Sequence, residues 1–226
     1  MIETHRDGWS RRELLELAMG CSGAALFGGV TPAVAGEKYA YTPVLTYGPF
    51  YPIEKPAERD ADLTRVAGAP APAKGQVVHV SGRVLNQVGE PVAGARIEIW
   101  QANAAGRYAH PSDRNSAPLD AGFQGFGVLE SDRDGHYSFK TVKPGAYPGA
   151  FAGLRAPHIH FDVTGRVNKL VTQMFFPGEP LNARDAILRA IPGGRQAAVT
   201  GRILAPTKNL EPDSLVELWD VVLITG

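Results

Sequence analysis

Hydrophobic and polar side chains alternate with a period of two along residues 157–163, and this alternation predicts a β-strand. The apolar face holds Ile159, Phe161 and Val163, and the opposite face holds His158, His160 and Asp162. One face therefore suits a hydrophobic core, while the other places two imidazoles side by side. Same-face neighbours lie roughly 6.5 Å apart, a separation that two imidazoles can close around one metal ion. The alternative is a solvated polar face without a metal.

The same kind of pattern predicts further short strands at residues 77–85, 96–101, 137–142, 170–176 and 214–224. A turn-rich loop, residues 86–94, joins the first two strands, and we expect them to be neighbours in one sheet. Only residues 183–190 have a helical pattern, which Pro192 and two glycines close. Many short strands with one short helix predict an all-β chain, built as a β-sandwich with long loops.

Composition and charge fit one globular domain. The chain has 226 residues, 44% of them hydrophobic, and its 26 glycines and 18 prolines suit an all-β core with many turns. The 23 basic and 23 acidic residues cancel, and no basic run indicates binding to a nucleic acid, so we expect a small or neutral partner. We divide the chain into a leader (residues 1–35), an extended arm (36–75) and a sandwich core (76–226).

The leader resembles a twin-arginine export signal. The pair Arg11-Arg12 precedes a mildly apolar run that is broken by Pro32 and ends at a small-residue site, residues 33–35. This run is too weak for a stable membrane span. The single cysteine, Cys21, lies inside the leader, so the mature chain would carry no disulfide. We expect a periplasmic or extracellular protein, with a retained amphipathic leader as the alternative.

Two turn-rich segments stand out in the rest of the chain. Residues 47–52 of the arm are dense in aromatic and turn residues, which suits either a loop packed over the sandwich or the wall of a pocket. The second segment contains Asp132 and Asp134, and its Asp134-Gly135 pair is the strongest local hairpin signal. The other positions of a calcium-binding loop are missing there, so an ordinary turn is predicted.

Two tyrosines lie on loops, where functional sites are commonly built. Tyr108 follows the strand predicted at residues 96–101, and Tyr147 lies in a tight turn before the histidine strand. Taken singly, each is expected to be a buried tyrosine with a hydrogen-bonded hydroxyl. Taken together with His158 and His160, they match a known pattern.

The chain resembles the intradiol ring-cleavage dioxygenases, the family of catechol 1,2-dioxygenase and protocatechuate 3,4-dioxygenase, over roughly residues 47–179. The matching motifs occur in the family's order, at residues 48–51, 94–103, 106–108, 144–148, 155–161 and 172–176. The resemblance implies one non-haem Fe(III) with a bound hydroxide, held by Tyr108, Tyr147, His158 and His160. It also implies that O2 cleaves a catechol-type diol to a cis,cis-muconate-type dicarboxylic acid.

The residue types agree with ferric iron. A free phenol titrates near pH ~10, so tyrosine binds as phenolate at neutral pH only when a strong Lewis acid displaces its proton. Zinc would prefer cysteine and histidine and would not need two tyrosines. A facial site of two histidines and one carboxylate would need Asp162, which lies about 13 Å along the strand from His158.

The resemblance also implies roles for residues beside the metal. Arg155 matches an arginine whose guanidinium faces the reacting ring carbon and stabilises its charge, and Gln173 matches a polar neighbour in the same pocket. Tyr147 matches the ligand that leaves the metal and accepts a substrate proton. For Arg155 and Gln173 the alternatives are a surface cation and a satisfied strand amide. Matches to the wall of the substrate pocket are Gly48, Pro49 and Trp100.

Two features depart from the family's pattern, and one other class of function competes with it. Gly149 stands where protocatechuate enzymes carry a tryptophan, which leaves the identity of the catechol open. The long helical N-terminal domain of catechol 1,2-dioxygenases is lacking, so their dimer does not follow and a homo-oligomer stays open. Residues 82–84 and 89–95 also resemble transthyretin-like and carboxypeptidase-regulatory-like domains, which are non-enzymatic β-sandwich modules.

The leader generates a first prediction. The mature protein should begin near Gly36 outside the cytoplasm, and joint replacement Arg11→Lys and Arg12→Lys should trap the precursor inside, because the export signal needs the arginine pair. N-terminal sequencing of protein from each cell fraction checks this. An intact Met1 on active cytosolic enzyme would contradict export.

Overall fold

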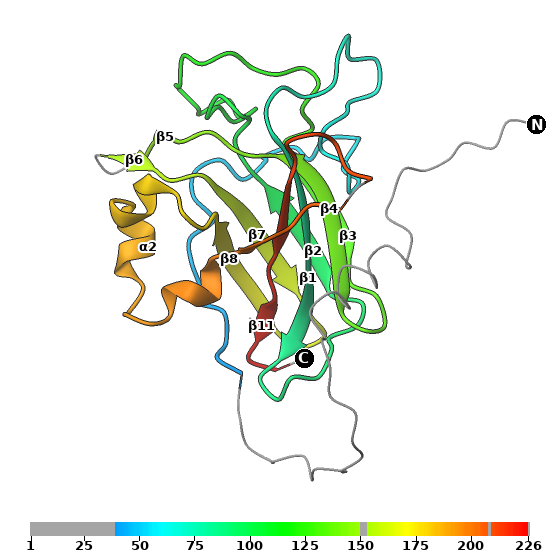
Figure 1. The fold of residues 1–226 in the computed structure, drawn as a ribbon, viewed down its shortest axis with the longest axis vertical. Coiled ribbons are helices and arrows are strands. Elements are labelled where there is room, and N and C mark those ends of the chain that lie inside the picture. The colour runs from blue at the N-terminus through cyan, green and yellow to red at the C-terminus, as the bar shows by residue number, and fades with distance from the viewer. Residues whose placement is uncertain (1–38, 150–152, 208, 226) are drawn as a thin grey trace, which may run out of the picture.

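Two β-sheets pack face to face in the computed structural model, with a two-stranded sheet beside one end (Figure 1). The structure describes residues 39–149, 153–207 and 209–225, so the predicted leader lies outside the described residues. The predicted all-β sandwich with one short α-helix is confirmed. Within the described part of the chain, no helix is both long and apolar enough to cross a lipid bilayer.

The first sheet is organised around its longest strand, β1 (Val77–Asn86). On one side β1 pairs antiparallel with β4 (His136–Val142). On the other side it pairs in parallel with β10 (Leu215–Leu218) and β11 (Val221–Leu223). The edge strand β9 (Arg202–Leu204) pairs with β10.

Strands β10 and β11 replace the single strand expected at residues 214–224. The break between them falls at Trp219, whose carbonyl oxygen would lie 1.7 Å from a Cβ atom at position 82. Because Gly82 has no Cβ atom, the backbone at Trp219 can pass directly against it. The hydroxyl of Tyr137 donates to the same carbonyl at 2.6 Å. A side chain at position 82 would push the two segments apart.

The second sheet carries the histidine strand. Its order is β3 (Phe126–Glu130), β2 (Arg96–Trp100), β7 (His158–Thr164) and β8 (Lys169–Phe175), with all pairs antiparallel. The small sheet pairs β5 (Tyr147–Pro148) with β6 (Leu154–Arg155). Sequence analysis did not predict β3, β5, β6 or β9, because short strands offer too few residues for a period-two pattern.

The expectation that residues 77–85 and 96–101 are neighbours in one sheet is wrong. Strand β1 lies in the first sheet and β2 in the second. The Asp134-Gly135 turn likewise joins β3 to β4 across the two sheets. The alternating pattern specifies which residues face the core, and two facing sheets satisfy it as well as two neighbouring strands do.

The helix predicted at residues 183–190 is shorter in the structure. A 3₁₀ turn, η1 (Pro180–Ala183), precedes α2 (Ala186–Ala190), and a second 3₁₀ turn, η2 (Gln196–Val199), follows it. Asp185 is the N-cap of α2, and its side chain accepts hydrogen bonds from the amides of Ile187 and Leu188. Leu188 then packs α2 against the outer face of the second sheet.

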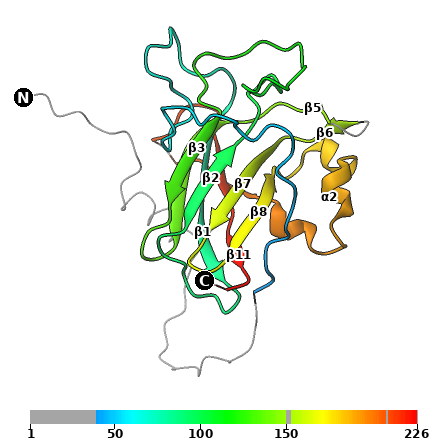
Figure 2. The same ribbon diagram turned by 180° about the vertical axis from the view of Figure 1, so that it is seen from behind.

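The core lies between the two sheets, and β7 contributes Ile159, Phe161 and Val163 to it as predicted. The opposite face of β7 is not solvated, since the exposed fractions of His158, His160 and Asp162 are 1%, 1% and 4%. Residues of the arm cover it (Figure 2).

Two tyrosines attach the arm to this outer face. The hydroxyl of Tyr47 donates to Asp162 at 2.5 Å, and the hydroxyl of Tyr51 donates to Glu98. Asp162 and Glu98 lie opposite each other on β7 and β2. The segment 47–52 is therefore a loop packed over the sandwich, which was one of its two predicted roles.

One carboxylate inside the fold has no hydrogen bond. Glu217 on β10 is fully buried, and neither of its oxygens has a partner among the described residues. Burial raises the pKa of Glu217 to about 7, and the charge of Lys143 offsets this only partly. Ionisation of this side chain is therefore unfavourable in the folded protein.

The burial of Glu217 generates a prediction on stability. Its pKa is higher in the folded than in the unfolded chain, so its contribution to stability is complete below pH ~4.5 and is lost as the pH rises to about 7. Glu217→Gln should raise the free energy of unfolding by roughly 2 to 3 kcal/mol at pH ~8 and by much less at pH ~5.

Thermal melting of parent and variant at both pH values checks this prediction. Glu130→Gln makes the same change of charge at an exposed strand end and serves as the control. A gain that is equal at the two pH values would contradict the assignment to Glu217.

Candidate metal centre

Three elements bring the two histidines and two tyrosines together. His158 and His160 lie on the outer face of β7, Tyr147 lies in β5, and Tyr108 lies on the long loop between β2 and β3. All four side chains are at most 4% exposed. The predicted set therefore converges at one end of the sandwich, under the arm.

Asn103 fixes the two tyrosine loops to each other. Its side-chain oxygen accepts from the amides of Ala105 and Arg107, and its backbone oxygen accepts from the amide of Gly145 at 2.9 Å. A Cβ atom at Gly106 would lie 2.2 Å from the carbonyl oxygen of Ala146, so the two loops touch. These contacts hold Tyr108 and Tyr147 on adjacent sides of the site.

Three of the polar atoms lie close together, and the Tyr108 ring lies beside them. The Nε2 atoms of His158 and His160 are 3.2 Å apart, and the hydroxyl oxygen of Tyr147 is 3.3 Å from Nε2 of His158. The ring centroid of Tyr108 lies 5.2 Å from that of Tyr147 and 6.2 Å from that of His160. One ion can contact all four side chains at such separations.

Both imidazoles are neutral at physiological pH. Burial and the charge of Arg155 lower the pKa of His158 to about 3. Burial and the neighbouring His158 hold the pKa of His160 well below its usual range. Nδ1 of His158 donates to the carbonyl of Ala156 at 2.6 Å, which leaves a lone pair on Nε2. A neutral imidazole with its lone pair aimed into the site is the form that binds a metal.

The two phenols require a cation before they can ionise. Burial, together with Tyr147, raises the pKa of Tyr108 well above its usual value, and burial also raises the pKa of Tyr147. The hydroxyl of Tyr108 is buried without a hydrogen bond of good geometry to any described residue. A buried hydroxyl beside two neutral imidazoles and a second phenol fits a metal ligand.

Arg155 and Gln173 line the same space. The Arg155 side chain is only 11% exposed, so it is no surface cation. Its Nη1 lies 3.5 Å from the Tyr147 hydroxyl oxygen, and its Nη2 donates to Oε1 of Gln173 at 2.6 Å. The amide of Gln173 donates in turn to the carbonyl of Thr46 at 2.9 Å. Strand pairing explains these positions, since Tyr147 is opposite Arg155 and His160 is opposite Gln173.

The residues predicted as pocket wall occupy different positions. Trp100 is buried and stacks on His160, with ring centroids 4.8 Å apart and planes 9° apart. A Cβ atom at Gly48, which has a φ of +67°, would lie 3.2 Å from the ring of His160. Pro49 lies exposed in the following turn. Gly48 thus keeps space open beside His160, while Trp100 supports the ring.

Phe50 is a neighbour of the site that sequence analysis did not single out by role. Its ring lies 4.7 Å from that of Tyr108 and 5.9 Å from that of Tyr147, measured between centroids. Phe50 therefore places the segment 47–52 beside Tyr108 and Tyr147, while its role as the wall of a substrate pocket stays a prediction.

Two acidic groups lie outside the set. Asp162 accepts from Tyr47 and pairs with Lys169 at 2.9 Å, so its Oδ2 atom already has two partners.

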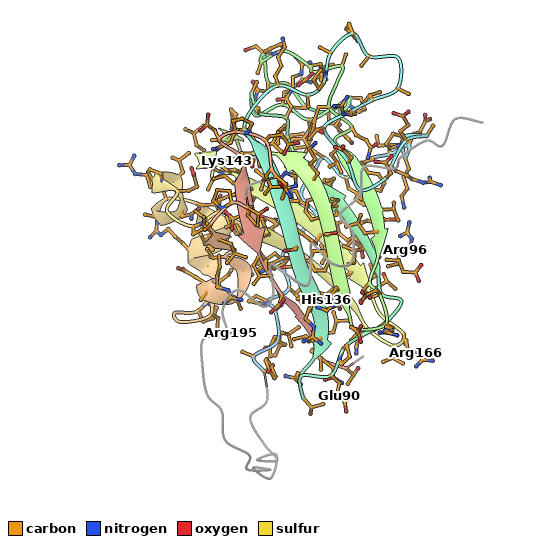
Figure 3. All side chains as sticks on the ribbon, turned by 45° about the vertical axis from the view of Figure 1, so that its right-hand side comes forward. Glu90, Arg96, His136, Lys143, Arg166 and Arg195 are labelled. Carbon is orange, nitrogen blue, oxygen red and sulfur yellow. The ribbon has the colours of Figure 1, made fainter. Side chains whose placement is uncertain are left out.

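Asp132, Asp134 and His136 also come close enough to hold an ion. They lie at the start of β4, at the opposite end of the strand from Lys143 and the Tyr147 loop (Figure 3). Asp132 accepts from the amides of Asp134 and His136, as in the ordinary turn that was predicted.

Sequence analysis missed Asp185, which contacts Arg155. One carboxylate oxygen, Oδ2, accepts from Nε of Arg155 at 2.8 Å and from the amide of Ala156 at 2.9 Å. An aspartate just before a helical pattern signals an N-cap. No sequence signal reveals the second contact, because it joins residues that are 30 positions apart.

Known proteins resemble this chain over most of its length. A family model described as dioxygenase matches residues 46–224. The protocatechuate 3,4-dioxygenase beta chain of Burkholderia cepacia is 42% identical over 181 residues, which cover 78% of this chain and 77% of that protein. Hydroxyquinol 1,2-dioxygenase of a Rhizobium species is 33% identical over 154 residues, which cover 62% of this chain and 49% of that protein.

Solved structures agree with these matches. The dioxygenase domain of a fusion with a carbohydrate-binding protein, from Streptomyces sp. SirexAA-E, superposes with a TM-score of 0.62 at 26% identity and covers 83% of this chain and 100% of that one. The match to the family model begins in the arm and continues through β11, and it favours an oxidoreductase over a non-enzymatic β-sandwich module. This chain belongs to the intradiol ring-cleavage dioxygenase family.

Proposed function

We propose that Tyr108, Tyr147, His158 and His160 hold one ferric ion, and that the protein uses O2 to cleave a catechol-type diol to a cis,cis-muconate-type dicarboxylic acid. The observation that carries this proposal is the convergence of two buried phenols and two neutral imidazoles at one end of the sandwich. Hard phenolate oxygens suit Fe(III), whereas zinc prefers thiolate and imidazole. Bound ferric iron would supply the Lewis acidity that ionises both phenols and activates the chelated diol.

The residues of the chain then handle protons and charge. The Tyr147 hydroxyl oxygen is the acceptor for a proton of the incoming diol, and Nη1 of Arg155, 3.5 Å away, stabilises negative charge beside it. Trp100 stacks on the ring of His160 and so fixes the orientation of that ring. Phe50 packs over the two tyrosines and excludes water from their side of the site.

The choice of catechol depends on the wall beside Arg155. A Cβ atom at Gly149 would lie 3.1 Å from Cγ of Arg155. A side chain at position 149 would therefore cover the aliphatic part of the Arg155 side chain, which glycine leaves uncovered. The similarity to a protocatechuate enzyme supports testing protocatechuate together with catechol, hydroxyquinol and chlorocatechols by oxygen uptake. The alpha chain of that Burkholderia cepacia enzyme is also similar, at 32% identity, which supports assembly of more than one chain.

The ligand set generates a prediction on metal content. The purified protein should carry about one iron per chain and be coloured by phenolate-to-iron charge transfer. Tyr108→Phe removes one phenolate and should bleach the colour and weaken iron binding by more than about tenfold. Metal analysis and the visible spectrum measure both quantities.

Tyr137→Phe is the matched control for Tyr108→Phe. Tyr137 is also buried, but it packs in the core between the two sheets, on the other face of β7 from the histidines, and its hydroxyl donates to the carbonyl of Trp219. It should retain iron and colour. A colourless parent protein that contains zinc and no iron would refute the proposed centre.

The position of Arg155 generates a prediction on rate. Arg155→Ala should keep iron, colour and the spectral shift on adding a catechol, because Arg155 is no ligand. It should lose about 2 to 4 kcal/mol of transition-state stabilisation, or roughly 30-fold to 1,000-fold in rate. Arg155→Lys should recover little, since an ammonium lacks the planar fork that also reaches Gln173.

Single-turnover decay of the substrate complex after mixing with O2 measures this effect. Arg195→Ala removes another guanidinium, one that contacts Tyr41 on the far side of α2, and should decay like the parent. Equal decay rates for the parent and Arg155→Ala would make Arg155 a bystander.

A further inference from the structure

Asp185 has two sets of contacts, and together they connect α2 to the candidate centre. Its Oδ1 atom accepts from the amides of Ile187 and Leu188, both at 3.0 Å. Its Oδ2 atom accepts from Nε of Arg155 at 2.8 Å and from the amide of Ala156 at 2.9 Å. The side chain is fully buried, so all four hydrogen bonds form away from water.

The contact with Arg155 fixes the plane of the guanidinium. Nε is held by Asp185 and Nη2 by Gln173, two different nitrogens of one rigid planar group. The remaining nitrogen, Nη1, is left directed at the Tyr147 hydroxyl oxygen. The carboxylate also compensates the charge of an arginine that is only 11% exposed, which an uncharged partner could not do.

The contact with Ala156 reaches the histidine strand. The amide of Ala156 donates to Asp185, while the carbonyl of Ala156 accepts from Nδ1 of His158 at 2.6 Å. One carboxylate oxygen therefore holds both the backbone that orients His158 and the side chain of Arg155. Structural support of this kind for a ligand or a charged group keeps it in its working orientation.

We propose that Asp185 is a positioning residue of the proposed dioxygenase: it acts through Arg155, holding the guanidinium in the plane that faces Tyr147. This inference rests on the proposed function for its effect on rate, but the contact that it concerns belongs to the chain itself. Among the described residues, the hydrogen bonds of the Asp185 side chain go to Arg155, Ala156, Ile187 and Leu188 and to none of the four proposed ligands. Its loss should therefore affect turnover without removing the metal.

Asp185→Asn tests the proposal with a small change in shape. Asparagine can keep Oδ1 as acceptor for α2, but it replaces Oδ2 by an NH2 group that confronts two N–H donors. In the metal-free full-length protein, proton–nitrogen NMR should show the Nε–H of Arg155 exchanging at least about tenfold faster than in the parent. The amides of Ile187 and Leu188 should stay protected, which reports an intact α2.

The loaded enzyme provides the second measurement. Asp185→Asn should keep iron and colour and lower kcat by about 10-fold to 100-fold, with a change in KM below about threefold. Combined with Arg155→Ala, it should slow the reaction no further, because the two residues act as one unit. Asp132→Asn makes the same substitution in the turn at the other end of the sandwich and should leave kcat unchanged.

Two results would overturn the proposal. One is an unchanged exchange rate of the Arg155 Nε–H in Asp185→Asn, and the other is a loss of rate that multiplies with that of Arg155→Ala. Failure of the proposed function looks different, because the parent would then lack iron or ring cleavage. The NMR measurement needs no metal, so it tests the contact between Asp185 and Arg155 whether or not the parent protein binds iron.

Discussion

The candidate metal centre depends on four buried, uncharged side chains that share one dry space. Two imidazoles of low pKa and two phenols of raised pKa lie buried beside one another, and the Tyr108 hydroxyl makes no hydrogen bond of good geometry to a described residue. In a buried site such groups cost free energy unless a cation binds them. The covering arm, the touching tyrosine loops and the stacked Trp100 all keep water out of this space. Their arrangement suits a bound metal more than an empty protein interior.

Sequence alone predicted the parts of the site that lie on regular structure or in dense motifs. The alternation at residues 157–163 placed both histidines on one face, and strand pairing then explains why Trp100, His160 and Gln173 form one row across the sheet. The tyrosines came only from the family resemblance, since nothing in a loop sequence shows that Gly106 touches Ala146. The two tyrosines come together because their loops touch, and a loop sequence has no periodic pattern that would predict such a contact.

Other features could not be predicted from the sequence, for physical reasons. An alternating strand pattern marks the side that faces the core, and it is silent on which sheet the strand joins, so β1 and β2 were wrongly placed together. The buried polar face of β7 was expected as either a metal site or a solvated surface, and the arm, attached through Tyr47 and Tyr51, excludes the solvated surface. Asp185 lies inside the helix predicted at residues 183–190, so neither its capping role nor its tertiary bond to Arg155 was predicted.

The attachment of the arm also constrains how this chain can fold. Tyr47 meets Asp162 across 115 residues, and Gln173 meets the carbonyl of Thr46 across 127. Contacts so distant in sequence close late and slowly, since the loop entropy is lost before the contact forms. During synthesis the aromatic cluster at residues 47–52 emerges long before the strands that it covers. This segment is thus synthesised before the strands β7 and β8 that it contacts, and until those strands form its tyrosines and phenylalanine are exposed to water.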